Sequence, residues 1–218
     1  LGKPFEVAVF LDTHGEEVNA FEGEIEFPKE SLELTEVRDG GTIASFWVEQ
    51  PRKDNPSFSG IIPGGYHGDQ GYLFSLIFVA KQAGEAVIST ARERVLLHDG
   101  EGSLAEFRPA PLTLTILKEP SLLGYTFQED REPPEAFTPV ASHDPNIFEG
   151  QWFLVFATQD KISGMDRYEV KEQREHGVWK LRFSQGTWDV GGSPYVLSDQ
   201  TRKSAILVKA IDKQGNER

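Results

Sequence analysis

Cysteine is absent from this chain of 218 residues. That absence excludes disulfide scaffolds, thiolate metal sites and cysteine nucleophiles together. The longest apolar runs, Tyr72–Ala80 and Trp152–Ala157, fall far short of the roughly 20 residues that a membrane-spanning helix needs. Positive charge is scarce too, because 22 basic residues face 35 acidic ones and leave a net charge of −13. An acidic surface repels a phosphate backbone, so we expect no nucleic-acid partner.

Motifs of common enzyme chemistry are missing as well. No G-x-S-x-G elbow and no H-E-x-x-H helix occurs, and the five histidines lie in or beside predicted turns. The glycine-rich stretch 63–68 lacks the lysine of a P-loop and precedes a strand instead of a helix. We therefore expect no catalytic residues and no enzymatic activity.

Apolar and polar residues alternate with a period of two along much of the sequence. Residues 21–27 place apolar residues and glycine at odd positions and glutamates at even ones, the pattern of a strand with one wet face. Turn signals separate the runs, so we predict an all-β protein of two β-sandwich domains in series. Expected strands are 5–11, 21–27, 32–37, 43–49, 58–62, 73–80, 85–90, 94–97 and 112–117, then 152–158, 167–171, 178–183, 195–197 and 205–211.

A charged, proline-rich stretch around 129–134 separates the two strand series. It predicts one domain at 1–118, a linker at 119–133 and a second domain at 134–218. Residues 1–118 hold 10 basic and 19 acidic residues, against 12 and 16 in residues 119–218, so the acidity belongs mainly to the first domain.

The two ends of the sequence predict a longer native protein. The chain starts at Leu1 without an initiator methionine, and a turn at 213–216 follows the expected strand 205–211. A sandwich normally adds a closing strand after such a turn. We therefore expect the second domain to be truncated at its last strand, and any signal peptide or membrane anchor to lie outside this sequence.

The first domain resembles a cohesin module, the β-sandwich of bacterial cell-surface and cellulosome scaffolds. The resemblance covers about residues 3–118 and rests on Pro4–Leu11, Ala20–Pro28 with Leu32–Gly40, Phe58–Gly60, and Gly71–Val87. It implies a jelly-roll sandwich and a protein partner, either dockerin-like or another surface protein. The residues that it places in the core are Ile25, Phe27, Leu34, Leu76 and Phe78.

The second domain looks like a bacterial immunoglobulin-like or fibronectin-type-III-like module. The resemblance rests on Ser163–Val170 and on the ending Val208–Glu217, which contains an "ala-x-asp-x-x-gly-asn" pattern. Modules of this kind serve as spacers, stalks or adhesive units, which implies an extracellular or cell-surface location.

Acidic residues offer two kinds of site in this sequence. Glu22, Glu24 and Glu26 share one face of a strand, which indicates either a patch for a basic protein partner or calcium, or an ordinary solvated face. Asp99 and Glu101 lie in a glycine-rich turn and are the better calcium candidates, because calcium prefers carboxylates and carbonyls gathered from a loop. Calcium is the only cofactor that the sequence predicts.

A smaller set of aspartates lies in the second domain. Asp160, Asp166 and Asp212 follow or precede its predicted strands, and we predict that they meet at one end of the sandwich.

Aromatic residues keep a carbohydrate-binding alternative open. Sugars stack on exposed flat rings, and Trp47, Tyr66 and Tyr72 are the candidates for such a platform. Trp47 directly follows Phe46, and successive side chains of a strand point to opposite faces, so one of the two points outward or into a second layer. The leading hypothesis is a non-enzymatic surface-protein segment that recognises another protein; polysaccharide binding and a purely structural stalk are the alternatives.

Overall fold

The computed structural model describes residues 1–118, 129–174 and 187–218. The chain forms two compact units, Leu1–Glu129 and Asp130–Arg218. Their boundary falls inside the stretch 119–133 that the sequence predicts as a linker; residues 119–128 of it lie outside the described residues, and Asp130 is buried in the second unit. Apart from one 3-10 turn at Phe148–Gly150, the regular elements of the described residues are β-strands, which confirms the all-β class. None of these residues forms a helix long and apolar enough to cross a membrane.

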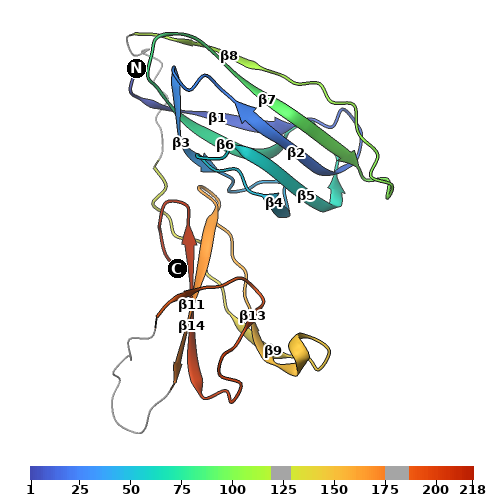
Figure 1. Ribbon diagram of the computed structural model, residues 1–218, viewed down its shortest axis with the longest axis vertical. Helices are drawn as coiled ribbons and strands as arrows, with labels where there is room; N and C mark the ends of the chain where they lie inside the picture. Colours follow the sequence, from blue (N-terminus) through green and yellow to red (C-terminus); the bar gives the residue numbers. More distant parts are fainter. Residues whose placement is uncertain (119–128, 175–186) are drawn as a thin grey trace. The chain divides into compact units, whose positions relative to one another are not determined.

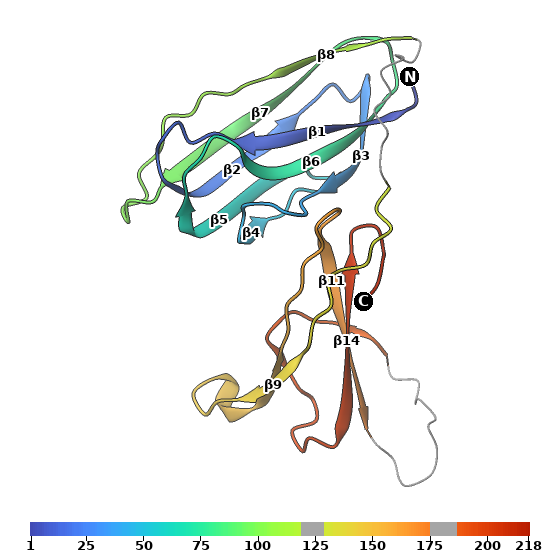
Figure 2. The same cartoon turned by 180° about the vertical axis from the view of Figure 1, so that it is seen from behind.

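The first unit consists of two antiparallel sheets, which Figures 1 and 2 show from opposite sides. One has the order β1-β6-β3 and the other the order β4-β5-β2-β7-β8. The strands are β1 (Pro4–Leu11), β2 (Val18–Glu26), β3 (Leu32–Arg38), β4 (Phe46–Glu49), β5 (Ser57–Tyr66), β6 (Gly71–Ala80), β7 (Gly84–Leu97) and β8 (Leu112–Ile116).

Aromatic rings fill the space between these two sheets. Phe58 of β5 meets Phe74 of β6 edge to face, with ring centroids 5.1 Å apart. Such pairs contribute about 0.5–1.5 kcal/mol beyond the burial of their area. The predicted core is confirmed, since Ile25, Leu34, Leu76 and Phe78 are buried and Phe27 packs against them.

Two glycines make room for the rings within the five-stranded sheet. Phe21 pairs with Gly60 and Gly23 pairs with Phe58 across β2 and β5. A Cβ on Gly60 would lie 2.5 Å from Phe21, and one on Gly23 would lie 2.8 Å from Phe58. Each ring thus covers the glycine opposite to it, as in the aromatic rescue of strand glycines.

The strands of the first unit differ from the prediction mainly in where they end. The runs predicted at 85–90 and 94–97 form the single strand β7, whose pairing with β2 shifts register between Glu22 and Glu24. This bulge accommodates Arg92, which has a left-handed φ of 54°. The extra residue of a bulge shifts the alternation of apolar and polar residues by one position. The sequence on its two sides therefore looks like two separate strands.

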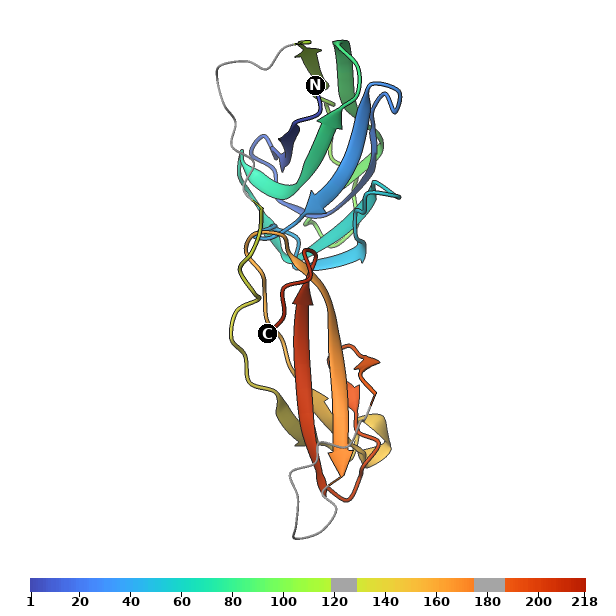
Figure 3. The ribbon, with the colours of Figure 1, turned by 90° about the vertical axis from the view of Figure 1, so that its left-hand side faces the viewer.

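The second unit also has two antiparallel sheets, with orders β13-β10-β9 and β12-β11-β14. Figure 3 shows its longest pair, β11 and β14, side by side. The core holds Leu154, Phe156, Val170 and Leu197, with the ring of Tyr168 against Phe156. Its strands are β9 (Val140–His143), β10 (Trp152–Val155), β11 (Met165–Arg174), β12 (Asp189–Val190), β13 (Tyr195–Val196) and β14 (Ser204–Asp212).

Short strands account for most differences in this unit. The sequence did not predict β9 and β12, and the strand predicted at 178–183 lies outside the described residues.

On the side of β14 away from β11, Ala210 and Arg218 exchange two backbone hydrogen bonds of 2.9 Å after a turn at 213–216. The immunoglobulin-like or fibronectin-like assignment of this unit stays a prediction.

Candidate functional site

Strand pairing fixes which side chains share the outer face of the five-stranded sheet. Residues paired across antiparallel strands point to the same face. Trp47, Gly60 and Phe21 form one such row, and it faces the core, because the rings of Trp47 and Phe21 lie 5.8 Å apart and Trp47 also meets Phe74 of the opposite sheet. The neighbouring row must therefore face outward. It consists of Phe46, Ile61, Ala20, Leu96 and Leu104, the last joined to Leu96 by a β-bridge.

This apolar row is most exposed at its two ends. Phe46 is 65 % exposed and Leu104 is 62 % exposed, while the three residues between them are half-buried. Val48, two residues from Phe46 on the edge strand β4, is 63 % exposed. Singly exposed apolar residues need no explanation, but a continuous row across four strands and a bridged segment is typical of a contact surface.

Charged residues lie beside the apolar row on the same face. Arg94 Nη1 is 3.1 Å from Glu22 Oε1, and Arg92 forms an ion pair with Glu24. Exposed pairs of this kind contribute about 0–1 kcal/mol to stability. The structure thus gives two of the three predicted glutamates an arginine partner, whereas no residue of the described part of the chain forms an ion pair with Glu26.

Glu24 and Glu26 also line an open groove of about 480 Å³ at the end of β2. Its walls combine these carboxylates with apolar side chains and one lysine, so the groove suits a partner group that carries both apolar surface and positive charge. The lining residues are Glu24, Ile25, Glu26, Phe27, Lys29, Pro56, Val87 and Ser89.

The three aromatic candidates do not form one platform. Trp47 faces the core, and Tyr66 lies at the end of β5, where its ring is close to Gly68 and Gly71. Tyr72 belongs to the other sheet; its hydroxyl donates a hydrogen bond to the carbonyl of Arg38, and its oxygen lies 3.1 Å from Ser75 Oγ. Burial raises the pKa of Tyr72 above its ordinary value.

The predicted calcium residues Asp99 and Glu101 lie together in the exposed turn after β7. Asp99 Oδ1 accepts hydrogen bonds from the backbone N–H groups of Glu101 (2.9 Å) and Gly102 (3.0 Å). This is the bonding of an Asx turn, and it occupies one carboxylate oxygen. Calcium at this turn stays a prediction.

These hydrogen bonds predict an acid-sensitive turn. The side chain of Ser103, followed by the backbone of Glu101, lowers the pKa of Asp99 from 3.8 to about 2. A carboxylate whose pKa falls on folding stabilises the fold above its unfolded pKa, and this contribution is lost as the pH falls from about 4 to 2. We expect the carboxyl carbon of Asp99 to titrate near pH 2 by NMR, while Asp99→Asn removes that part of the pH dependence. A titration midpoint near 3.8 would contradict the hydrogen-bonded turn.

Three carboxylates meet at one end of the second unit. Oxygens of Asp130, Asp160 and Asp212 all lie within 4.8 Å of one another, and all three residues are buried. Two of them, Asp160 and Asp212, belong to the trio predicted from sequence. The third predicted member, Asp166, instead lies exposed beside Arg167. The sequence pattern gave no reason to add Asp130, because it lies in the stretch expected to be a linker.

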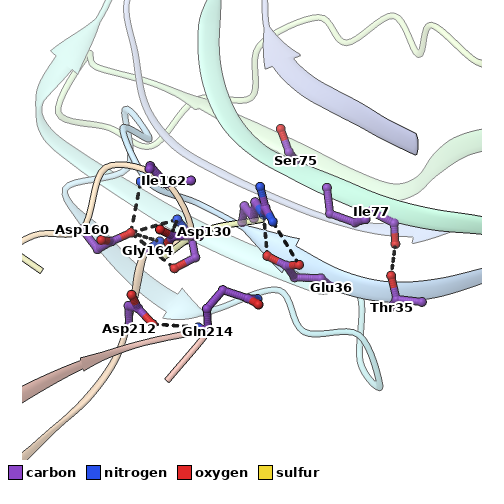
Figure 4. A network of polar contacts seen from close by, with 12 residues as sticks. Thr35, Glu36, Ser75, Ile77, Asp130, Asp160, Ile162, Gly164, Asp212 and Gln214 are labelled. Atoms are coloured by element: carbon purple, nitrogen blue, oxygen red, sulfur yellow. Dashed lines mark hydrogen bonds and ion pairs between the residues drawn. The ribbon is translucent and has the colours of Figure 1, made fainter. Parts of the chain in front are cut away.

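Backbone donors compensate this buried negative charge. Asp160 Oδ1 accepts bonds from the N–H groups of Ile162, Ser163 and Gly164, as Figure 4 shows in part. Asp212 Oδ1 accepts bonds from the N–H groups of Gln214 and Asn216. Carboxylate oxygens so gathered could hold a divalent cation, and they also tie three distant segments of the unit together.

The fold and these surfaces define an all-β protein of two units, with an exposed apolar row on one sheet of the first. No protein-family model matches the chain, and no curated protein matches it. Among the solved structures that are similar to it, two match over 53 % of its length. One is a cohesin module of a family 33 glycoside hydrolase from Clostridium perfringens, with 16 % identity, a TM-score of 0.44 and 87 % of that chain covered. The other belongs to a type I cohesin–dockerin complex from Clostridium thermocellum, with 13 % identity, a TM-score of 0.37 and 86 % of that chain covered.

Proposed function

We propose that the first unit is a non-enzymatic protein-recognition module and that the outer face of its five-stranded sheet holds the partner. The observation that carries this proposal is the apolar row from Phe46 to Leu104, with both ends more than half exposed. A few buried side chains near the centre of a contact, often aromatic and surrounded by polar groups, supply most of the binding energy in protein interfaces.

The negative charge beside this face indicates which kind of protein surface it binds. Glu26 and the acid-lined groove add negative potential to one side of the apolar row. We infer a partner surface that presents apolar side chains flanked by lysine or arginine. A dockerin-like protein is one candidate, because the resemblance of the sequence to cohesins implies it.

Polysaccharide binding is the weaker proposal. A sugar platform needs flat rings exposed on one surface, and Trp47 instead packs against Phe21 while Tyr72 lies on the opposite sheet. For the second unit we propose a spacer role, and for both units an extracellular or cell-surface setting.

Substitution at the ends of the apolar row tests the proposal. We expect Phe46→Asp and Leu104→Asp each to weaken binding of a protein partner about thirtyfold, since an interface hot spot contributes about 2 kcal/mol or more. Binding is measured by isothermal titration against a panel of dockerin modules and soluble polysaccharides. Val190→Asp is the matched control, because Val190 is 73 % exposed but belongs to the second unit.

Two outcomes would overturn the proposal. One is a protein partner whose affinity is unchanged by both substitutions in the apolar row. The other is tight polysaccharide binding that survives these substitutions but is lost in a Tyr66→Ala or Trp47→Ala variant that remains folded.

A further inference from the structure

A cavity of about 260 Å³ lies where β1 ends, β2 begins and the segment after β7 returns. Its floor is apolar, formed by the buried side chains of Leu11, Val18 and Val95 together with Ala105. The remaining lining residues are Asp12, Thr13, His14, Glu16, Glu106, Phe107 and Arg108. Cavities for drug-sized ligands measure about 300–1,000 Å³, so this one suits a single side chain or a small amine.

Hydrogen bonds hold both walls of the cavity in place. On one wall, Thr13 N donates to the carbonyl of Gly68 at 2.9 Å, and Gly68 N donates to Thr13 Oγ1 at 3.1 Å. On the other wall, Ala105 N donates to the carbonyl of Val95 at 2.9 Å. A cavity whose walls are already ordered loses little entropy when a ligand enters.

The mouth of the cavity is acidic. The carboxylates of Asp12, Glu16 and Glu106 line it, against the one guanidinium of Arg108. Asp12 is engaged within its own turn, where it accepts a hydrogen bond from His14 N. Among the residues that the structure describes, none forms an ion pair with Glu16 or Glu106, so both carboxylates are available to a cation.

We propose that this cavity binds an alkylammonium group, the chemistry of a lysine side chain. The methylene chain lies on the apolar floor, where burial contributes about 0.8 kcal/mol per CH₂. The ammonium lies at the mouth between Glu16 and Glu106. Phe107, which is 39 % exposed, also lines the cavity, and the face of an aromatic ring attracts such a cation.

NMR titration of the whole chain with small probes tests this site. We expect Nα-acetyl-lysine methylamide and n-pentylamine to bind with millimolar affinity and to shift the methyl resonances of Val18, Val95 and Ala105. Nα-acetyl-norleucine methylamide has a similar apolar stem without the ammonium, and we expect it to bind at least about fivefold more weakly.

Two glutamate-to-glutamine variants, which change the net charge by the same amount, test where the cation binds. Glu106→Gln should weaken binding of the lysine probe about two- to fivefold, the range for a partly exposed ion pair, and high salt should reduce this difference. Glu85→Gln alters an exposed glutamate near the other end of β7 and should leave the affinity unchanged.

The outcomes separate the possible sources of the amine. Binding of both amines supports the shared chemistry; binding of the lysine probe alone assigns the cavity to a protein side chain, and binding of pentylamine alone to a free amine. Equal affinity for the norleucine probe, or equal effects of Glu106→Gln and Glu85→Gln, would overturn the proposal. Because the probes contain no part of a protein partner, failure here leaves the proposed recognition face untouched.

Discussion

Gly60→Ala should destabilise the first unit by about 1–3 kcal/mol, the usual cost of overpacking a filled core. The new Cβ would lie 2.5 Å from Cζ and 3.0 Å from Cε1 of the Phe21 ring. Phe21 is only 3 % exposed and packs against both Trp47 and Phe58, so its ring has little freedom to move away. Urea unfolding followed through amide resonances of the first unit measures the change.

Gly64→Ala provides the control within the same strand. A Cβ there meets nothing within 4 Å, and the backbone is not left-handed, so an alanine fits without strain. We expect its free energy of unfolding to stay within about 0.5 kcal/mol of the parent or to rise slightly. Equal destabilisation by both substitutions would contradict this account, because it would mean that replacing a glycine is costly even where no ring is close.

Asp160→Ala should destabilise the second unit by about 1–3 kcal/mol. The substitution removes the acceptor of three backbone N–H groups, those of residues 162, 163 and 164, at distances of 2.8–3.0 Å. Two of these donors are buried; Ser163 N also donates to Asp130 Oδ2 at 3.1 Å, but Gly164 N would lose its acceptor, and a buried donor without a partner costs about 1–3 kcal/mol. Urea unfolding followed through amide resonances of the second unit measures the effect.

Asp166→Ala is the matched control for this substitution. Asp166 is exposed and pairs with the exposed Arg167 at 2.5 Å, an arrangement that contributes about 0–1 kcal/mol. A loss of stability as large as that of Asp160→Ala would contradict the distinction that the structure draws between the two aspartates.

Local patterns predicted the parts of the fold that depend on neighbouring residues. Alternation in 21–27 predicted a strand with one buried face, whereas the core placement of Ile25 and Phe78, which the structure confirms, came from the resemblance to cohesins. The bulge at Arg92 escaped prediction, because one inserted residue shifts the parity and imitates a strand boundary. Strands as short as β12, with two residues, leave no periodic signal to detect.

The candidate site depends on pairing between distant segments, which one sequence does not reveal. Opposite parity of Phe46 and Trp47 shows that one of them points outward, but only the contact of Trp47 with Phe21 decides which. Leu104 joins the apolar row through a bridge to Leu96 inside an irregular return, and no local pattern predicts that bridge. Likewise, the sequence shows Glu22 and Glu24 only as an acidic face, whereas the pairing of β2 with β7 places Arg94 opposite Glu22 and brings Arg92 of the bulge into an ion pair with Glu24.

The most direct test of the account is a hydrogen-exchange footprint of the first unit with its bound protein partner. If the outer face of the five-stranded sheet holds the partner, amides of Phe46–Glu49 and those around Ile61, Leu96 and Leu104 should gain protection. Amides of β1 and β3, at the edges of the other sheet, should be unchanged. Protection confined to β1, β6 and β3, or to the second unit, would contradict the proposed recognition face.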